Sequence, residues 1–174
     1  MKNKVSATLV LMLSCNIPAL AQDHLLSWKE YVYANDGFAV TLPYAPTPHP
    51  DPNNTNITVY TVHPSADISV SLRVVNETRD CASTLSTLKD GALHGRQPRQ
   101  PIDPLSVKEF SVNGYPGVEY QFQSGPGHTT YDRYYCVTGK FYIFSADWAG
   151  NGAKPSAVTH IVNSFRLLSP GAHK

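Results

Sequence analysis

The stretch from residue 115 to residue 144 constrains the fold of this chain more than any other. Its thirty residues hold nine of the eighteen aromatic residues in the sequence. Gly-containing turns at 124–127 and 138–139 divide it into three runs rich in aromatic and β-branched residues, at 115–122, 128–137 and 141–144. Such runs between tight turns are typical of antiparallel strands, so the stretch predicts a three-stranded meander.

Further strands are predicted on both sides of this meander. Residues 37–43, 57–63 and 68–74 alternate apolar with small or polar residues, and 106–112 reaches the meander through the Asn113–Gly114 turn. The segment from Pro43 to Asn56 holds five prolines, so we expect a long surface loop there.

Two helices are predicted from capping and spacing. Asp80 is a candidate N-cap, Gly95 a candidate stop, and an apolar stripe follows at Cys81, Leu85, Leu88 and Ala92. The second helix begins near Pro155 and carries a stripe at Val158, Ile161, Val162 and Phe165. Residues 141–144 are apolar on both faces, which favours a central strand covered on both sides. The fold class expected is therefore α+β, an antiparallel sheet of about seven strands sandwiched by two helices. The rival is a closed β-barrel with a helix outside, as in lipocalins.

Composition limits the possible partners. The chain has 174 residues, 41% hydrophobic and 16% charged, which suits one compact domain. Its net charge is +1, and loss of Lys2 and Lys4 with a leader would make it −1. A nearly neutral chain without basic runs gives no reason to expect nucleic-acid binding. No apolar run approaches the roughly 20 residues of a membrane span.

The N-terminus has the pattern of a secretory leader. Lys2 and Lys4 precede a short apolar run, and Ala19-Leu20-Ala21 is an A-x-A cleavage site. We therefore expect a signal peptide at 1–21, an arm at 22–36, a single domain at 37–168 and a flexible tail at 169–174. The mature protein would be secreted or periplasmic after cleavage following Ala21. Lipidation at Cys15 is the alternative.

Export decides how the cysteines are interpreted. Removal of the leader leaves Cys81 and Cys136, and an even count in an oxidising compartment favours one disulfide. The alternative, a reactive or metal-binding pair, lacks a Cys-x-x-Cys spacing or a His at ligand spacing.

Few residues suggest a functional site. The sequence has no G-x-S-x-G, H-E-x-x-H or Walker motif, so no catalytic residue, metal or cofactor is predicted. His128 shares a strand face with Asp132, but four residues separate them, about 13 Å along a strand. Asp147 and Trp148, before a Gly-rich loop, are possible partner or ligand contacts, as is His128. For Trp148 the alternative is packing over the rim of the core, and for His128 a polar residue near a loop.

Three short segments carry a family resemblance. Residues 37–43 (GFAVTLP), 112–119 (VNGYPGVE) and 163–168 (NSFRLL) resemble segments of small secreted domains with the PsbP-like fold. PsbP is an extrinsic subunit of the photosystem oxygen-evolving complex. The resemblance spans about residues 31–168 and implies an α/β/α sandwich with a non-enzymatic binding or assembly role.

Two functions are thus expected from the sequence. The first is a non-catalytic binding or assembly module with an unknown protein partner in the cell envelope. The second is a small-ligand or metal-binding protein, or an unrecognised hydrolase, with a cleft near Trp148. The second would require His128, Asp147 and His160 to converge in space.

Overall fold

The computed structural model describes residues 27–76, 80–94, 107–137, 140–150 and 152–168. The expected signal peptide, the tail at 169–174, Cys15 and the candidate stop Gly95 lie outside these ranges. Among the described residues, no helix is both long and apolar enough to cross a membrane.

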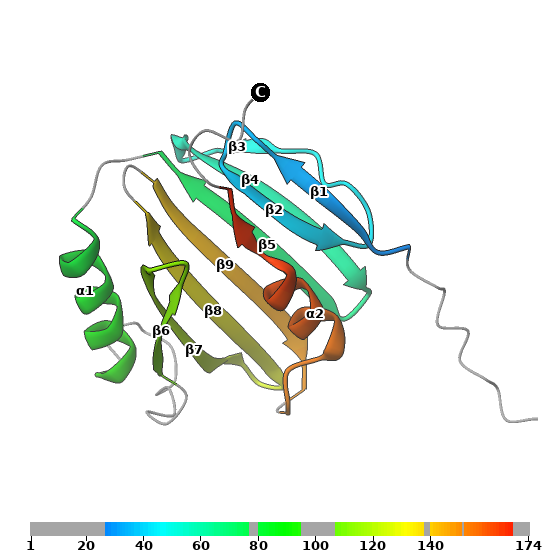
Figure 1. Ribbon diagram of the computed structural model, residues 1–174. Helices are drawn as coiled ribbons and strands as arrows, with labels where there is room; N and C mark the ends of the chain where they lie inside the picture. The colour runs from blue at the N-terminus through cyan, green and yellow to red at the C-terminus, as the bar shows by residue number, and fades with distance from the viewer. Residues whose placement is uncertain (1–26, 77–79, 95–106, 138–139, 151, 169–174) are drawn as a thin grey trace, which may run out of the picture.

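A seven-stranded sheet forms the centre of the molecule (Figure 1). Every neighbouring pair in it is antiparallel, as the sequence predicted. Its strands, in spatial order, are β3 (His49–Asp51), β4 (Asn54–Ser65), β5 (Ile68–Val75), β9 (Lys140–Ala149), β8 (His128–Val137), β7 (Tyr115–Gly125) and β6 (Lys108–Val112). The sheet is open, with β3 and β6 at its edges, so the rival barrel does not form.

The meander β7–β8–β9 contains the predicted central strands. At its start, Asn113 and Gly114 have φ of 52° and 82°, the backbone that a tight two-residue hairpin turn requires. The last strand continues past residue 144 to Ala149, so Asp147 and Trp148 belong to β9 and not to the loop after it.

A second, three-stranded sheet corrects one part of the prediction (Figure 1). Residues 37–43, expected in the main sheet, form β2 (Phe38–Leu42) between β1 (Lys29–Tyr33) and β10 (Arg166–Leu167). β2 is almost wholly buried, and Phe38, Val40 and Leu42 pack in the core between the small sheet and the large one. β1 lies within the segment expected to be an arm.

The predicted loop from Pro43 to Asn56 is also corrected. It contains β3, and β4 begins at Asn54. β3 is a three-residue edge strand with Pro50 at its middle. Proline is tolerated there because an edge strand does not need every backbone N–H for pairing.

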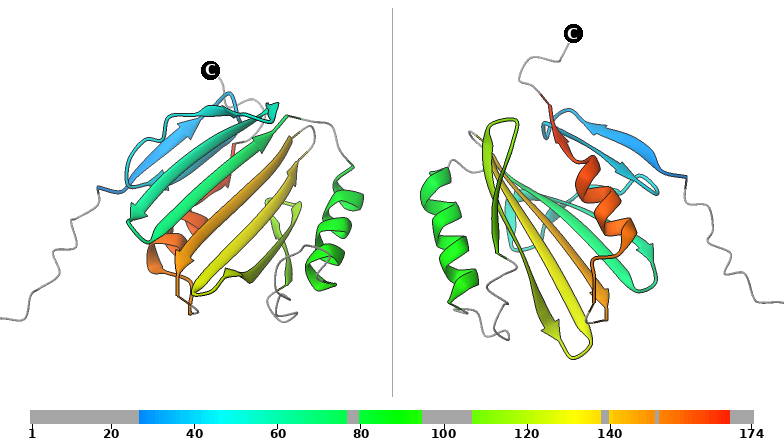
Figure 2. Two further views of the ribbon diagram at one scale, coloured as in Figure 1. Left: turned by 180° about the vertical axis from the view of Figure 1, so that it is seen from behind. Right: turned by 60° about the horizontal axis from the view of Figure 1, so that its bottom comes forward.

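The two faces of the large sheet are covered differently (Figure 2). We call the face toward α1 (Cys81–Leu93) the outer face and the opposite one the inner face. The inner face packs on the small sheet and on α2 (Ser156–Ser164), and this interface holds the main core. Buried core residues from each layer include Phe38, Leu72, Phe144, Trp148, Val158 and Ile161.

α1 is capped and cross-linked as the sequence predicted. The Asp80 carboxylate accepts a hydrogen bond from the backbone N–H of Ser83 at 2.9 Å. Cys81, in the first turn, forms a disulfide with Cys136 on β8. Leu85 and Leu88 pack with Cys136 on the outer face, so the apolar stripe points at the sheet.

Candidate functional site

The outer face has a polar half that no described helix covers. The left view of Figure 2 looks onto this face, with α1 at one side and β4, β5 and β9 crossing the rest. Strand register brings five polar residues into one row across this face: Thr61, Ser71, Ser145, Asp132 and Tyr120. Asp132 and Tyr120, at the α1 end of the row, are buried, and Tyr120 packs with Ala92 of α1. We call this row and its neighbours Ser69, Ser124, His128, Thr130 and Asp147 the outer polar face.

Asp147 is one hydrogen-bonding centre of the outer polar face. Its Oδ2 accepts bonds from the hydroxyls of Ser124 at 2.8 Å and Thr130 at 2.7 Å. Its Oδ1 lies 3.4 Å from Nδ1 of His128. The side chains of His128 and Asp147 are 56% and 44% exposed, so both can reach a molecule docked on this face. The structure therefore brings together two of the three predicted contact residues.

Asp132 is the second centre, and it is 9% exposed. Its Oδ1 accepts a 2.6 Å bond from Ser145, and its Oδ2 accepts a 3.2 Å bond from the hydroxyl of Tyr134. Tyr134 in turn accepts a 3.0 Å bond from Tyr120. Burial, followed by the nearby Asp132 carboxylate, raises the pKa of Tyr134 far above its usual range. This tyrosine is therefore a fixed donor at neutral pH.

Trp148 does not join this group. Successive side chains of a strand point to opposite faces, so Trp148 points inward while Asp147 points outward. Trp148 is 3% exposed and packs in the main core, which agrees with the packing alternative. His160 lies on α2, where its ring makes an edge contact with Trp28 at 4.6 Å between centroids. The convergence of His128, Asp147 and His160 does not occur.

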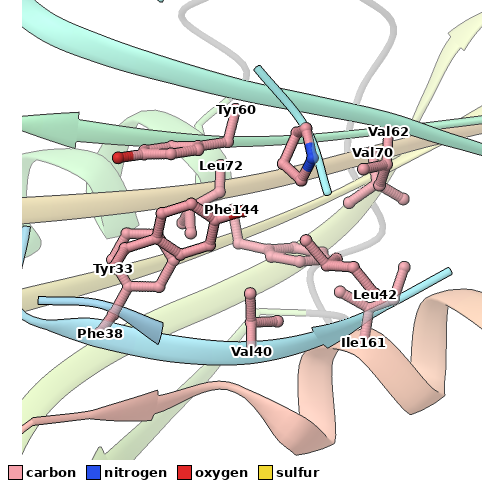
Figure 3. Close-up of a pocket in the computed structure, with 11 residues that line it drawn as sticks. Tyr33, Phe38, Val40, Leu42, Tyr60, Val62, Val70, Leu72, Phe144 and Ile161 are labelled. Carbon is pink, nitrogen blue, oxygen red and sulfur yellow. The ribbon is translucent and has the colours of Figure 1, made fainter. Parts of the chain in front are cut away.

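A small cavity lies between the two sheets (Figure 3). A cavity of about 10 Å³ lies between β2, the large sheet and α2. This is near the lower limit for a single water molecule. Its lining is apolar apart from tyrosine hydroxyls, and includes Phe38, Val40, Leu42, Leu72, Phe144 and Ile161.

The chemistry available on the outer polar face is that of a hydrogen-bonding surface. The Ser124 and Thr130 hydroxyls donate to Asp147, and the Ser145 hydroxyl donates to Asp132. These hydroxyls are therefore not paired with a histidine base, as an activated nucleophile would be. Within the described ranges, no three His, Cys, Asp or Glu side chains are grouped so that they could hold a metal ion.

Comparisons with known proteins identify the fold. No protein-family model matches the sequence, and no curated protein sequence matches it. The structure is similar to the solution structure of cyanobacterial PsbP (CyanoP) from Synechocystis sp. PCC 6803. The TM-score is 0.56 at 11% identity, over 87% of this chain and 98% of that one.

A second similar structure is a crystal structure from Bacteroides thetaiotaomicron VPI-5482. The TM-score is 0.52 at 8% identity, over 82% of this chain and 49% of that one. This chain thus corresponds to about half of the Bacteroides chain. The two likenesses confirm the predicted PsbP-like α+β fold.

Proposed function

We propose that this protein is a non-catalytic binding or assembly module whose outer polar face docks a protein partner. The observation that carries the proposal is the row of polar side chains across β4, β5 and β9, where Thr61, Ser71 and Ser145 are half-buried and no described helix covers them. Strands hold these groups at fixed spacing, so a partner meets a surface that is already ordered. Preorganisation of this kind reduces the entropy lost on binding.

The outer polar face also indicates what the partner contributes. Asp147 is about half exposed and Arg73, on the same face, is exposed. A partner surface with donors for Asp147 and a carboxylate for Arg73 would replace the water on these groups, whereas an apolar surface would remove that water without replacing its hydrogen bonds. The interface should therefore be polar.

The proposed location is outside the cytoplasm, secreted or periplasmic. Two observations support it: the leader pattern that ends at Ala21 and the Cys81–Cys136 disulfide. Disulfides persist mainly in oxidising compartments. The partner is thus expected in the cell envelope.

Site-specific photo-crosslinking tests the docking face. p-Benzoylphenylalanine is placed at Ser71, between Thr61 and Ser145 in the polar row, or at Ser86, an exposed residue of α1 that serves as the control. We expect one discrete cross-linked protein from position 71 and none from position 86. Thr61→Arg, next to Ser71 in the row, should abolish that product, and Ser86→Arg should not.

Thermal melting of each variant verifies that it folds. No discrete product from position 71, or equal products from positions 71 and 86, would refute docking on this face. Retention of the product in a folded Thr61→Arg variant would do the same.

A further inference from the structure

A cluster of charged side chains lies on the inner face, where β6, β7 and β8 run side by side. Lys108, Glu119 and Arg133 form one row across these strands. Oε2 of Glu119 lies 3.3 Å from Nε of Arg133 and accepts a 2.5 Å bond from the hydroxyl of Tyr131. Lys154, from the segment before α2, lies over the Tyr131 ring with its Nζ 3.3 Å from the centroid. We call Lys108, Glu119, Arg133 and Lys154 the inner charged corner.

Two of these cations, Arg133 and Lys154, lie over the faces of aromatic rings. Cζ of Arg133 is 4.1 Å from the centroid of Phe110 and 5.0 Å from that of Tyr135. A cation–π contact uses the flat face of the guanidinium and leaves its N–H groups directed outward in the plane. Nε of Arg133 is buried and forms no hydrogen bond of good geometry. The cation is therefore fixed in position, and a ligand can reach it only through the 15% of its side chain that stays exposed.

A glycine allows this arrangement. The ring of Phe110 lies where a side chain at Gly117 would be, because a Cβ there would come 2.3 Å from Cζ of Phe110. The Phe110 ring thus packs against β7 at Gly117 and contacts Arg133.

The inner charged corner has an excess of positive charge. Among the described residues of this corner, three cations, Lys108, Arg133 and Lys154, lie near one carboxylate, Glu119, which leaves an excess of two positive charges. The nearest acidic residue along β6, Glu109, faces the other way and pairs with Lys89 of α1 at 2.5 Å. Burial is the main cause that lowers the pKa of Lys154, and an anion bound beside it would offset that cost.

We propose that the inner charged corner binds a carboxylate group. The in-plane N–H groups of Arg133 suit the two oxygens of a carboxylate, and Lys154 and Lys108 add charge from the sides. The surrounding aromatic rings favour a flat organic body. The carboxylate can come from a free organic acid or from an acidic side chain of a peptide. This site is on the opposite face from the outer polar face and is independent of it.

Titration followed by NMR of the Arg133 Nε–H resonance tests this site directly. Sodium benzoate, which carries the carboxylate, is compared with benzamide, which has the same shape and no charge. A second arm uses a blocked tri-glutamate peptide. We expect a saturable shift with benzoate and none with benzamide. The peptide distinguishes the two sources of the carboxylate, because tighter binding of the peptide than of benzoate would identify an acidic segment of a peptide as the ligand.

Charge-removing variants complete the test. Lys154→Gln and Lys108→Gln should each weaken benzoate binding about fivefold. Lys89→Gln, on the outer face, is the matched control and should change nothing. The proposal is overturned if benzoate gives no saturable shift, if benzamide acts equally, or if both corner variants bind as tightly as the wild type.

Discussion

Breaking the Cys81–Cys136 disulfide tests how α1 is held on the outer face. The bridge joins residues 55 positions apart. Closing a loop of that size in the unfolded chain is worth about 4 kcal/mol in the chain-entropy model. α1 has little else to hold it, because among its residues only Leu85 and Ala92 are buried. For a domain of this size, the loss should lower the melting temperature by about 8–16 °C.

Urea unfolding of the oxidised and the reduced wild type measures this loss. Reduction removes no residue, so the difference isolates the cross-link. Cys81→Ala/Cys136→Ala should lose more, because Cys136 is buried and its removal leaves a cavity. Added reductant should not change the double variant further. A reduced wild type within about 1 kcal/mol of the oxidised protein would refute the entropic reasoning.

Two further predictions concern packing and pH. Gly117→Ala should destabilise by about 1–3 kcal/mol, because its Cβ would collide with Phe110 and with the carbonyl oxygen of Tyr134. Gly91→Ala, in α1 with open space around it, is the control and should stabilise the protein by about 1 kcal/mol. Equal urea midpoints for the two variants would contradict this account. Burial raises the pKa of Tyr33, Tyr135 and Tyr142 from 10.0 to about 12. The folded protein therefore keeps protons that the unfolded chain releases, so stability should be complete below pH 10 and fall as the pH rises toward 12. Urea midpoints that rise over this window would show the opposite sign.

Short-range signals in the sequence predicted the elements whose formation depends on residues close to one another along the chain. The N-cap Asp80 and the stripe through Leu85 determine α1, and Asn113–Gly114 determines a hairpin. The position of β2 could not be predicted in this way. Its partner β10 lies at the far end of the chain and has two residues, too few to show any alternation.

The candidate site was only partly predictable for a similar reason. Alternation continues from Phe144 through Trp148, but the glycines that follow suggested a loop, and so Asp147 and Trp148 were not assigned to opposite faces. Counting back from the pair Val137 and Lys140 places Thr130 opposite Asp147. That register was available from the hairpin, and it would have identified the hydroxyl partners of Asp147.

The small sheet also imposes an order on folding. The backbone N–H of Thr41 donates to Ser164 Oγ, 123 positions later, and β2 pairs with β10 nearby. During synthesis, Phe38 is made early, but its stacking partner Phe165 and the paired strand β10 are made last. Contacts between such distant segments slow folding. The growing chain should therefore remain a client for holdase chaperones until nearly its whole length has been made.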